Sequence, residues 1–176
     1  MIRVLVAEDS PTARALLVGI LSGAPEFQVV GEATDGIEAV ALTKSLRPDI
    51  VTMDIQMPGL DGFQATKQIM VEAPTPIVII SSLDVSTVRF SMDALQAGAL
   101  AVLPKPVGPA SPDFEDVSRY LIGMVRAMSQ VKIVRRWAHA PPYRATTGPH
   151  KVVAPERATC KPRVVAIAAS TGGPSA

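Results

Sequence analysis

The sequence predicts an α/β fold, a doubly wound parallel sheet of five strands with five helices. Two observations lead to this prediction. Over the first hundred residues, short aliphatic runs alternate with amphipathic segments, as they do in successive βα units. Of the 176 residues, 48% are hydrophobic but only 4% are aromatic, so the core must be aliphatic, which suits buried parallel strands.

The expected strands are short apolar runs, most of them rich in β-branched residues. None of these runs is long enough to favour a helix instead. They are Ile2–Ala7, Val29–Ala33, Ile50–Met53, Ile77–Ile80 and Leu100–Leu103.

A helix is expected after each strand. The first has Ser10 as its N-cap and Pro11 at its first position, and apolar residues follow at i, i+3 and i+4 spacing as far as Leu21. The remaining helices are Gly36–Leu46, which ends before Pro48, Phe63–Val71, Ser86–Gln96 and about Phe114–Val131.

Two of these helices have a distinct apolar face. In the second helix, Ile37, Val40 and Ala41 lie on one face. In the fifth it is a continuous apolar stripe made of Val117, Tyr120, Leu121, Met124, Val125 and Met128.

The charge balance and the proline content change along the chain. Residues 1–107 carry 7 Lys and Arg against 12 Asp and Glu, whereas residues 108–176 carry 10 against 4. Prolines interrupt any regular pattern in the second part, which predicts a linker. We expect three parts: a domain over 1–132, a basic linker over 133–162, and the first strand and turn of a truncated domain over 163–176.

Composition also limits the class of protein. Cys160 is the only cysteine, so an internal disulfide is excluded, and no histidine stands at metal-ligand spacing from it. The apolar run at the N-terminus is too short for a signal peptide, and no stretch approaches the length of a membrane span. We expect a cytoplasmic protein that is not inserted in a membrane.

Acidic residues follow the first and third expected strands, at the edge of the sheet where ligands bind in such folds. Glu8 and Asp9 come after the first strand, and Asp54 ends the third. Right-handed crossovers place these two strands side by side, so the three carboxylates converge. Close carboxylates repel one another and favour a hard divalent cation with oxygen ligands. The sequence therefore predicts a Mg²⁺ site.

Two more strand ends reach the same edge, with Ser81 after the fourth strand and Lys105 after the fifth. A hydroxyl and an ammonium beside a carboxylate–metal cluster suit a phosphoryl group, whose negative charge needs donors and cations. We expect the Asp54 carboxylate to attack phosphorus and form an acyl phosphate. Each residue alone also fits a helix cap or a surface charge, so the prediction depends on their order along four strands.

The residues Glu8-Asp9-Ser10, Met53–Gly62 around Asp54, Ser81-Ser82 and Lys105-Pro106 resemble the response-regulator receiver family of two-component signalling. The resemblance covers residues 1 to about 107 and implies a flavodoxin-like sheet in the order 2-1-3-4-5. It also implies that Asp54 is the phosphoacceptor for a histidine kinase.

The same resemblance implies roles for the other site residues. Asp9, Asp54 and the Gln56 carbonyl would bind Mg²⁺ directly, while Glu8 would act mainly through water. Ser81 would be the switch hydroxyl, and Lys105 would contact the phosphoryl group. The sequence departs from the family at Val102, where an aromatic residue often stands whose rotation accompanies activation.

Near the C-terminus, Val164–Pro174 forms a strand-like run that delivers Ser170 into a glycine turn. Such a serine suits an acyl-transfer nucleophile, although a phosphate-cradling loop fits almost as well. Together with the receiver and the linker, this run resembles the start of the chemotaxis protein-glutamate methylesterases, which demethylate receptor glutamates and deamidate receptor glutamines.

This second resemblance implies that Ser170 is the esterase nucleophile of a domain in cis, that the kinase is of the chemotaxis type, and that chemoreceptors are the eventual substrate. The family also needs a catalytic His and Asp from farther along. His139 and His150 both lie in the linker and do not match the catalytic position. We therefore expect this chain to be inactive as an esterase.

Other interpretations stay open. A receiver acting alone would regulate a partner through its fourth helix, fifth strand and fifth helix. A magnesium phosphohydrolase would need two aspartates spaced by one residue after the first strand, which Glu8-Asp9-Ser10 does not supply. Lys132, Arg135 and Arg136 beside Trp137 would suit nucleic acid, but no recognised module follows, so we expect no nucleic-acid partner and a linker that packs on protein.

Overall fold

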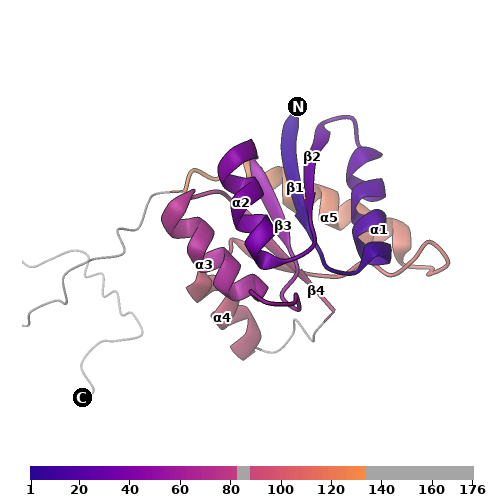
Figure 1. The fold of residues 1–176 in the computed structure, drawn as a ribbon. Coiled ribbons are helices and arrows are strands. Elements are labelled where there is room, and N and C mark those ends of the chain that lie inside the picture. The colour runs from indigo at the N-terminus through magenta and orange to yellow at the C-terminus, as the bar shows by residue number, and fades with distance from the viewer. Residues whose placement is uncertain (83–87, 134–176) are drawn as a thin grey trace, which may run out of the picture. The chain divides into compact units, whose positions relative to one another are not determined.

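The computed structural model describes residues 1–82 and 88–133. Five parallel strands form one sheet in the order β2-β1-β3-β4-β5, which confirms the predicted fold class and strand order (Figure 1). The strands are β1 Ile2–Ala7, β2 Phe27–Ala33, β3 Ile50–Met53, β4 Ile77–Ser81 and β5 Ala101–Pro104. The helices are α1 Pro11–Ser22, α2 Gly36–Leu46, α3 Gly62–Glu72, α4 Val88–Ala97 and α5 Phe114–Ser129.

The predicted elements agree with these bounds to within about two residues. Strand β2 begins earlier than expected because Phe27 is buried and pairs with Ile2 of β1. The expected start of the fourth helix at Ser86 and nearly all of the expected linker lie outside the described residues. In the described part of the chain, no helix is long and apolar enough to cross a membrane.

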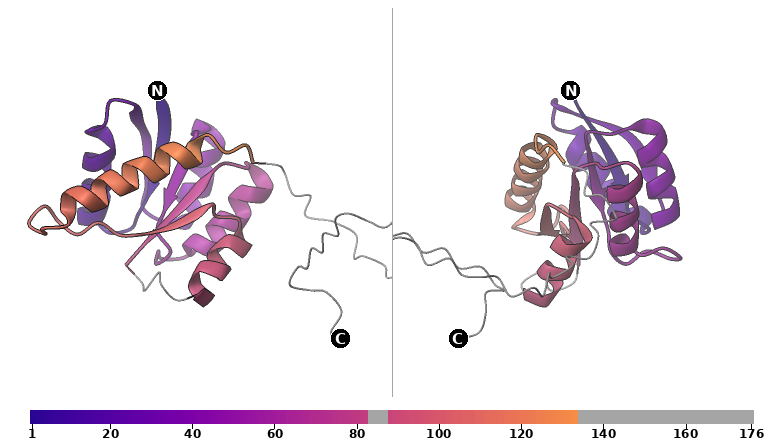
Figure 2. Two further views of the ribbon diagram at one scale, coloured as in Figure 1. Left: turned by 180° about the vertical axis from the view of Figure 1, so that it is seen from behind. Right: turned by 90° about the vertical axis from the view of Figure 1, so that its left-hand side faces the viewer.

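Helices cover both faces of the sheet, α1 and α5 on one side and α2, α3 and α4 on the other (Figure 2). Because side chains alternate along a strand, β1 supplies both layers. Val4 and Val6 join the core cluster that includes α1 and α5, whereas Leu5 and Ala7 join the cluster that includes α2 and α3. Burial on both faces explains why the strands are continuous aliphatic runs rather than alternating ones.

The apolar face expected for α2 is only partly buried. Ile37 is 65% exposed and Ala41 is also exposed, and of the predicted residues only Val40 is buried. The helix instead packs through its smallest residues, since a Cβ at Gly36 would lie 2.2 Å from the carbonyl oxygen of Leu60. The close approach of the two backbones at Gly36 thus accompanies the burial of Ala39 and Val40 in the core. The full buried set is Gly36, Ala39, Val40 and Thr43.

The stripe predicted for α5 needs one correction. Leu121 and Val125 are buried, and Met124 and Met128 pack against the same core, but Tyr120 is 56% exposed. Tyr120 lies at the border of the stripe, whereas its neighbour Leu121 is buried in the core.

Candidate functional site

The carboxyl ends of four strands carry the candidate functional residues, as predicted. Strands β1 and β3 are neighbours, with Ala7 paired with Met53, so the residues that follow them lie side by side. The Asp54 amide donates to the carbonyl of Ala7 at 2.9 Å, which continues the sheet one residue past β3. On the other side, the Lys105 amide donates to the Ser81 carbonyl at 3.0 Å and ties the ends of β4 and β5 together.

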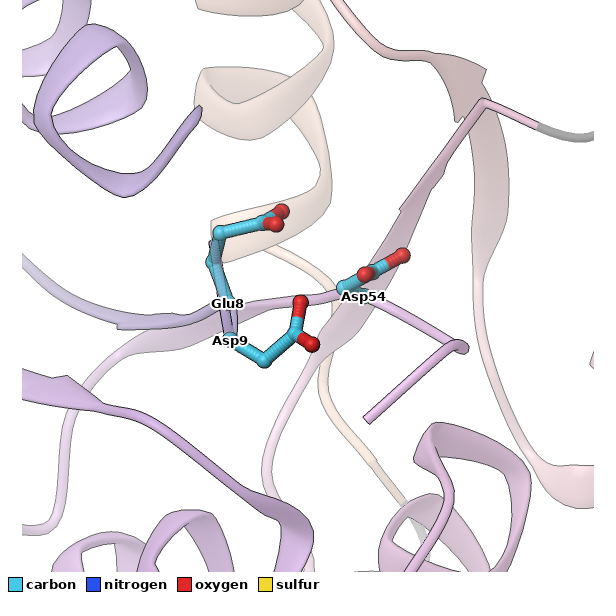
Figure 3. Close-up of side chains that lie close together, drawn as sticks. All are labelled: Glu8, Asp9 and Asp54. Atoms are coloured by element: carbon cyan, nitrogen blue, oxygen red, sulfur yellow. The ribbon is translucent and has the colours of Figure 1, made fainter. Parts of the chain in front are cut away.

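The carboxylates of Glu8, Asp9 and Asp54 converge at this edge (Figure 3). One oxygen from each lies within 4.8 Å of the others. Glu8 is fully buried and Asp54 is 3% exposed, whereas Asp9 is exposed and leaves the group open to solvent. The sequence prediction that these three acids meet is confirmed geometrically.

Lys105 bridges the two buried acids. Its Nζ donates to Glu8 Oε1 at 2.9 Å and to Asp54 Oδ2 at 2.9 Å. The lysine side chain is 18% exposed, so its ammonium is held mostly away from water. When all four groups are ionised, one cation faces three anions, and the site keeps an excess of negative charge.

Burial, hydrogen bonds and neighbouring charges change the pKa values of two groups of the site. Burial raises the pKa of Glu8, an effect that the Lys105 hydrogen bond opposes and the charge of Asp54 reinforces. Burial alone would lower the pKa of Lys105, but its hydrogen bonds to Glu8 and Asp54 raise it overall. The lysine is therefore a permanent cation of the site at neutral pH.

The residues present fit a magnesium ion. Oε2 of Glu8 is buried and has no hydrogen-bond partner within the described residues, although a buried carboxylate oxygen normally has one. The donor set is all oxygen and carries excess negative charge, as a hard divalent cation requires. Asp9 is the exposed member, so a bound ion would retain access to water, which Mg²⁺ commonly keeps.

The backbone around Asp54 holds its carboxylate in place. Oδ1 of Asp54 accepts from the Ile55 amide at 2.7 Å, which leaves Oδ2 for Lys105. The loop then returns tightly, with the Gly62 amide donating to the Ile55 carbonyl at 3.0 Å. A Cβ at Gly62 would lie 1.9 Å from the Asp54 carbonyl oxygen, so only glycine fits at the start of α3.

The remaining predicted residues lie around this cluster. Ser81 is 1% exposed at the end of β4. Gln56 lies in the loop after β3, two residues beyond Asp54, with an exposed side chain. Val102 is partly buried and packs against a small cluster that includes Ile55 and Ile79, so it fills a space beside the site with an aliphatic side chain.

Two residues beside the site, Arg14 and Gly62, are not indicated by the sequence pattern. Arg14 on α1 donates to the carbonyl oxygens of Glu8 and Asp9, although nothing in the sequence distinguishes it from an ordinary surface arginine of a helix. Gly62 stands in the run that resembles the receiver family, but its close contact with Asp54 appears only in the structure. Ser170, His139 and His150 lie outside the described residues.

Comparison with known proteins agrees with this geometry. The family model for the response regulator receiver domain matches residues 4–111. The chain belongs to the response regulator receiver domain family. The crystal structure of the response regulator domain of Thermotoga maritima CheB is similar, with a TM-score of 0.69 and 41% identity. The match covers 76% of this chain and 99% of that chain.

Two curated relatives extend the match beyond the receiver. Both are protein-glutamate methylesterases/protein-glutamine glutaminases. The one from Anaeromyxobacter dehalogenans is 60% identical over 176 residues, 100% of this chain and 50% of the relative. The one from Myxococcus xanthus is 57% identical over 177 residues, 99% of this chain and 49% of the relative. The chain thus spans about half the length of these relatives, and the matches favour a methylesterase-type response regulator over a receiver acting alone.

Proposed function

We propose that this chain accepts a phosphoryl group on Asp54 and thereby regulates a methylesterase output. The observation that carries the proposal is the position of Lys105, whose Nζ lies 2.9 Å from both Asp54 and Glu8 at the edge where the acids converge. A fixed cation beside the attacking carboxylate is what a transferring phosphoryl group needs, because its oxygens carry the negative charge.

In the proposed reaction, a carboxylate oxygen of Asp54 attacks the phosphorus of a phosphohistidine on the kinase. A new O–P bond forms, the N–P bond breaks, and the imidazole nitrogen keeps the electron pair of the broken bond. The Ile55 amide and Lys105 hold the Asp54 carboxylate in one orientation before the attack. Lys105 then offers its charge to the oxygens of the transferred group.

Glu8, Asp9, Asp54 and the Gln56 carbonyl are the groups that we assign to Mg²⁺. When bound, the ion supplies positive charge to the phosphoryl oxygens. We assign Glu8 a role mainly through water, as the resemblance to the receiver family implies, since its Oε1 already accepts a hydrogen bond from Lys105. Ser81 at the end of β4 is assigned to the phosphoryl group as a hydroxyl donor.

The output is proposed from the relatives. The match to the Anaeromyxobacter methylesterase/glutaminase covers the whole chain, so it includes Ser170. We assign Ser170 as the esterase nucleophile of a domain regulated in cis. Receptor glutamates and glutamines are the proposed substrates, a chemotaxis histidine kinase is the phosphodonor, and the cytoplasm is the compartment.

A small-molecule phosphodonor tests the proposal. The chain is treated with acetyl phosphate in Mg²⁺ or in EDTA, and its intact mass is measured. We expect one added phosphoryl group, only with Mg²⁺, and no addition to Asp54→Asn. The matched control is Asp113→Asn, because Asp113 precedes α5 without making a side-chain cap. An unchanged mass of the parent chain in Mg²⁺ would contradict the proposal.

A further inference from the structure

Arg14 lies in the first turn of α1 and reaches back over the loop that carries the acids. Its Nη1 donates to the Glu8 carbonyl oxygen at 2.8 Å and to the Asp9 carbonyl oxygen at 3.4 Å. Its Nε forms an ion pair with Glu32 Oε2 of β2 at 3.2 Å. The Arg14 side chain is only 17% exposed, so these contacts are largely shielded from water.

These bonds complete the support of the loop backbone between β1 and α1. The carbonyl of Ala7 accepts from the Asp54 amide, and the next two carbonyls along the chain, those of Glu8 and Asp9, both accept from Arg14. The direction in which a side chain leaves the backbone depends on the orientation of the peptide units beside it. Arg14 therefore restrains the two residues whose carboxylates must meet Asp54.

Charge alone would give Arg14 the opposite effect on a metal site. A guanidinium close to the acids repels an incoming Mg²⁺, so its removal would strengthen metal binding if electrostatics dominated. However, Arg14 is paired with Glu32 and does not donate to the carboxylates that face the site, which reduces its electrostatic effect there. Orientation and charge thus predict changes of opposite sign in the affinity for Mg²⁺.

We propose that Arg14 is a positioning residue for the magnesium site, which holds Glu8 and Asp9 by their backbone carbonyls in the orientation that brings their carboxylates beside Asp54. The inference rests on the proposed function, because it concerns the same metal site. Partners behind metal ligands commonly change metal affinity by 10- to 100-fold when they are removed.

The test is a titration of the 176-residue chain with Mg²⁺. The NMR shifts of the backbone amides around Asp54 report binding and give the affinity. We expect Arg14→Met to bind Mg²⁺ about tenfold more weakly than the parent. Arg14→Lys keeps the charge but loses the planar fork, so it should also bind more weakly, though by less. At saturating Mg²⁺, the rate of phosphorylation of Arg14→Met should return close to that of the parent.

The controls separate this inference from the proposed function. Arg119→Met removes an exposed arginine of α5, paired with Asp116, and should leave the affinity unchanged. If both Arg14 variants bind Mg²⁺ as tightly as the parent or more tightly, the positioning role alone is overturned. It is also overturned if Arg14→Met has unchanged affinity but is phosphorylated more slowly than the parent at saturating Mg²⁺. If Arg14→Met does not fold, Arg14→Lys decides. Failure of the parent to bind Mg²⁺ would overturn the proposed function as well.

Discussion

Lys105 donates to two carboxylates, Glu8 and Asp54, that are almost completely buried. A buried charge is costly unless it is paired, so the lysine stabilises the fold in the absence of metal. In the proposed function it also contacts the transferred phosphoryl group. The same residue thus links stability to chemistry.

Replacing Lys105 should lower the stability of the chain and make it more dependent on Mg²⁺. Lys105→Met leaves two buried acids without their cation, so we expect the free energy of unfolding in EDTA to fall by about 2–3 kcal/mol. Urea denaturation provides the measurement. Added Mg²⁺ should stabilise the variant more than the parent, because the ion replaces the missing charge. Lys67→Met, at an exposed position of α3, is the control and should have little effect.

Glu8 makes stability depend on pH. Burial raises its pKa above the ordinary value of 4.5, so the folded chain keeps this proton to a higher pH than the unfolded chain. The stability gained from the protonated form is therefore complete below pH 4.5 and is lost as pH rises through the raised pKa. In EDTA, the stability of Glu8→Gln relative to the parent should increase from pH 4 toward neutral pH, as measured by urea denaturation. A difference that is constant with pH would contradict the assigned shift.

At the scale of elements, two glycines in helices should respond to substitution with opposite signs. A Cβ at Gly62 would meet the Asp54 backbone, whereas a Cβ at Gly19 in α1 would have nothing within 4 Å. We expect Gly62→Ala to destabilise the chain by about 2 kcal/mol and Gly19→Ala to stabilise it by about 0.5–1 kcal/mol. Thermal unfolding of the two variants measures both. Equal effects would show that the close approach at Gly62 is not what requires glycine.

The elements also show what sequence patterns can and cannot predict. Strands such as Ile50–Met53 were located correctly because a short β-branched run has few alternatives. The exposure of Ile37 in α2 was not predicted, because the face of α2 that meets the core carries Ala39, Val40 and Thr43, and small residues give a weak signal in the pattern of hydrophobicity. At the site, the meeting of Glu8, Asp9 and Asp54 followed from strand order. The hydrogen bond from the Ile55 amide to Asp54 could not be predicted from residue types, because every residue except proline has a backbone amide donor.

At the scale of the whole molecule, the hydrophobic core of the described residues is built from the segment between β1 and α5. All three clusters of buried hydrophobic residues are built from residues between Val4 and Val125. The domain boundary near residue 132 stays a prediction from the sequence, because nearly all of the chain beyond it lies outside the described residues.

A truncation tests that boundary. A chain of residues 1–133 should unfold cooperatively, with the same midpoint in urea as the 176-residue chain, because it keeps every described core contact. It should also accept a phosphoryl group at the same rate. A lower midpoint for the shorter chain would show that residues beyond 133 contribute to the stability of the receiver.

The central claim is that Asp54 is the residue that carries the phosphoryl group, and the most direct measurement is to locate that group in the chain. After treatment with acetyl phosphate and Mg²⁺, borohydride reduction converts a phosphoaspartate to homoserine, which peptide mass spectrometry can identify. The account predicts homoserine at position 54 and at no other aspartate, with none formed in EDTA. Homoserine at Asp9 or Asp61 with Asp54 unchanged would contradict it.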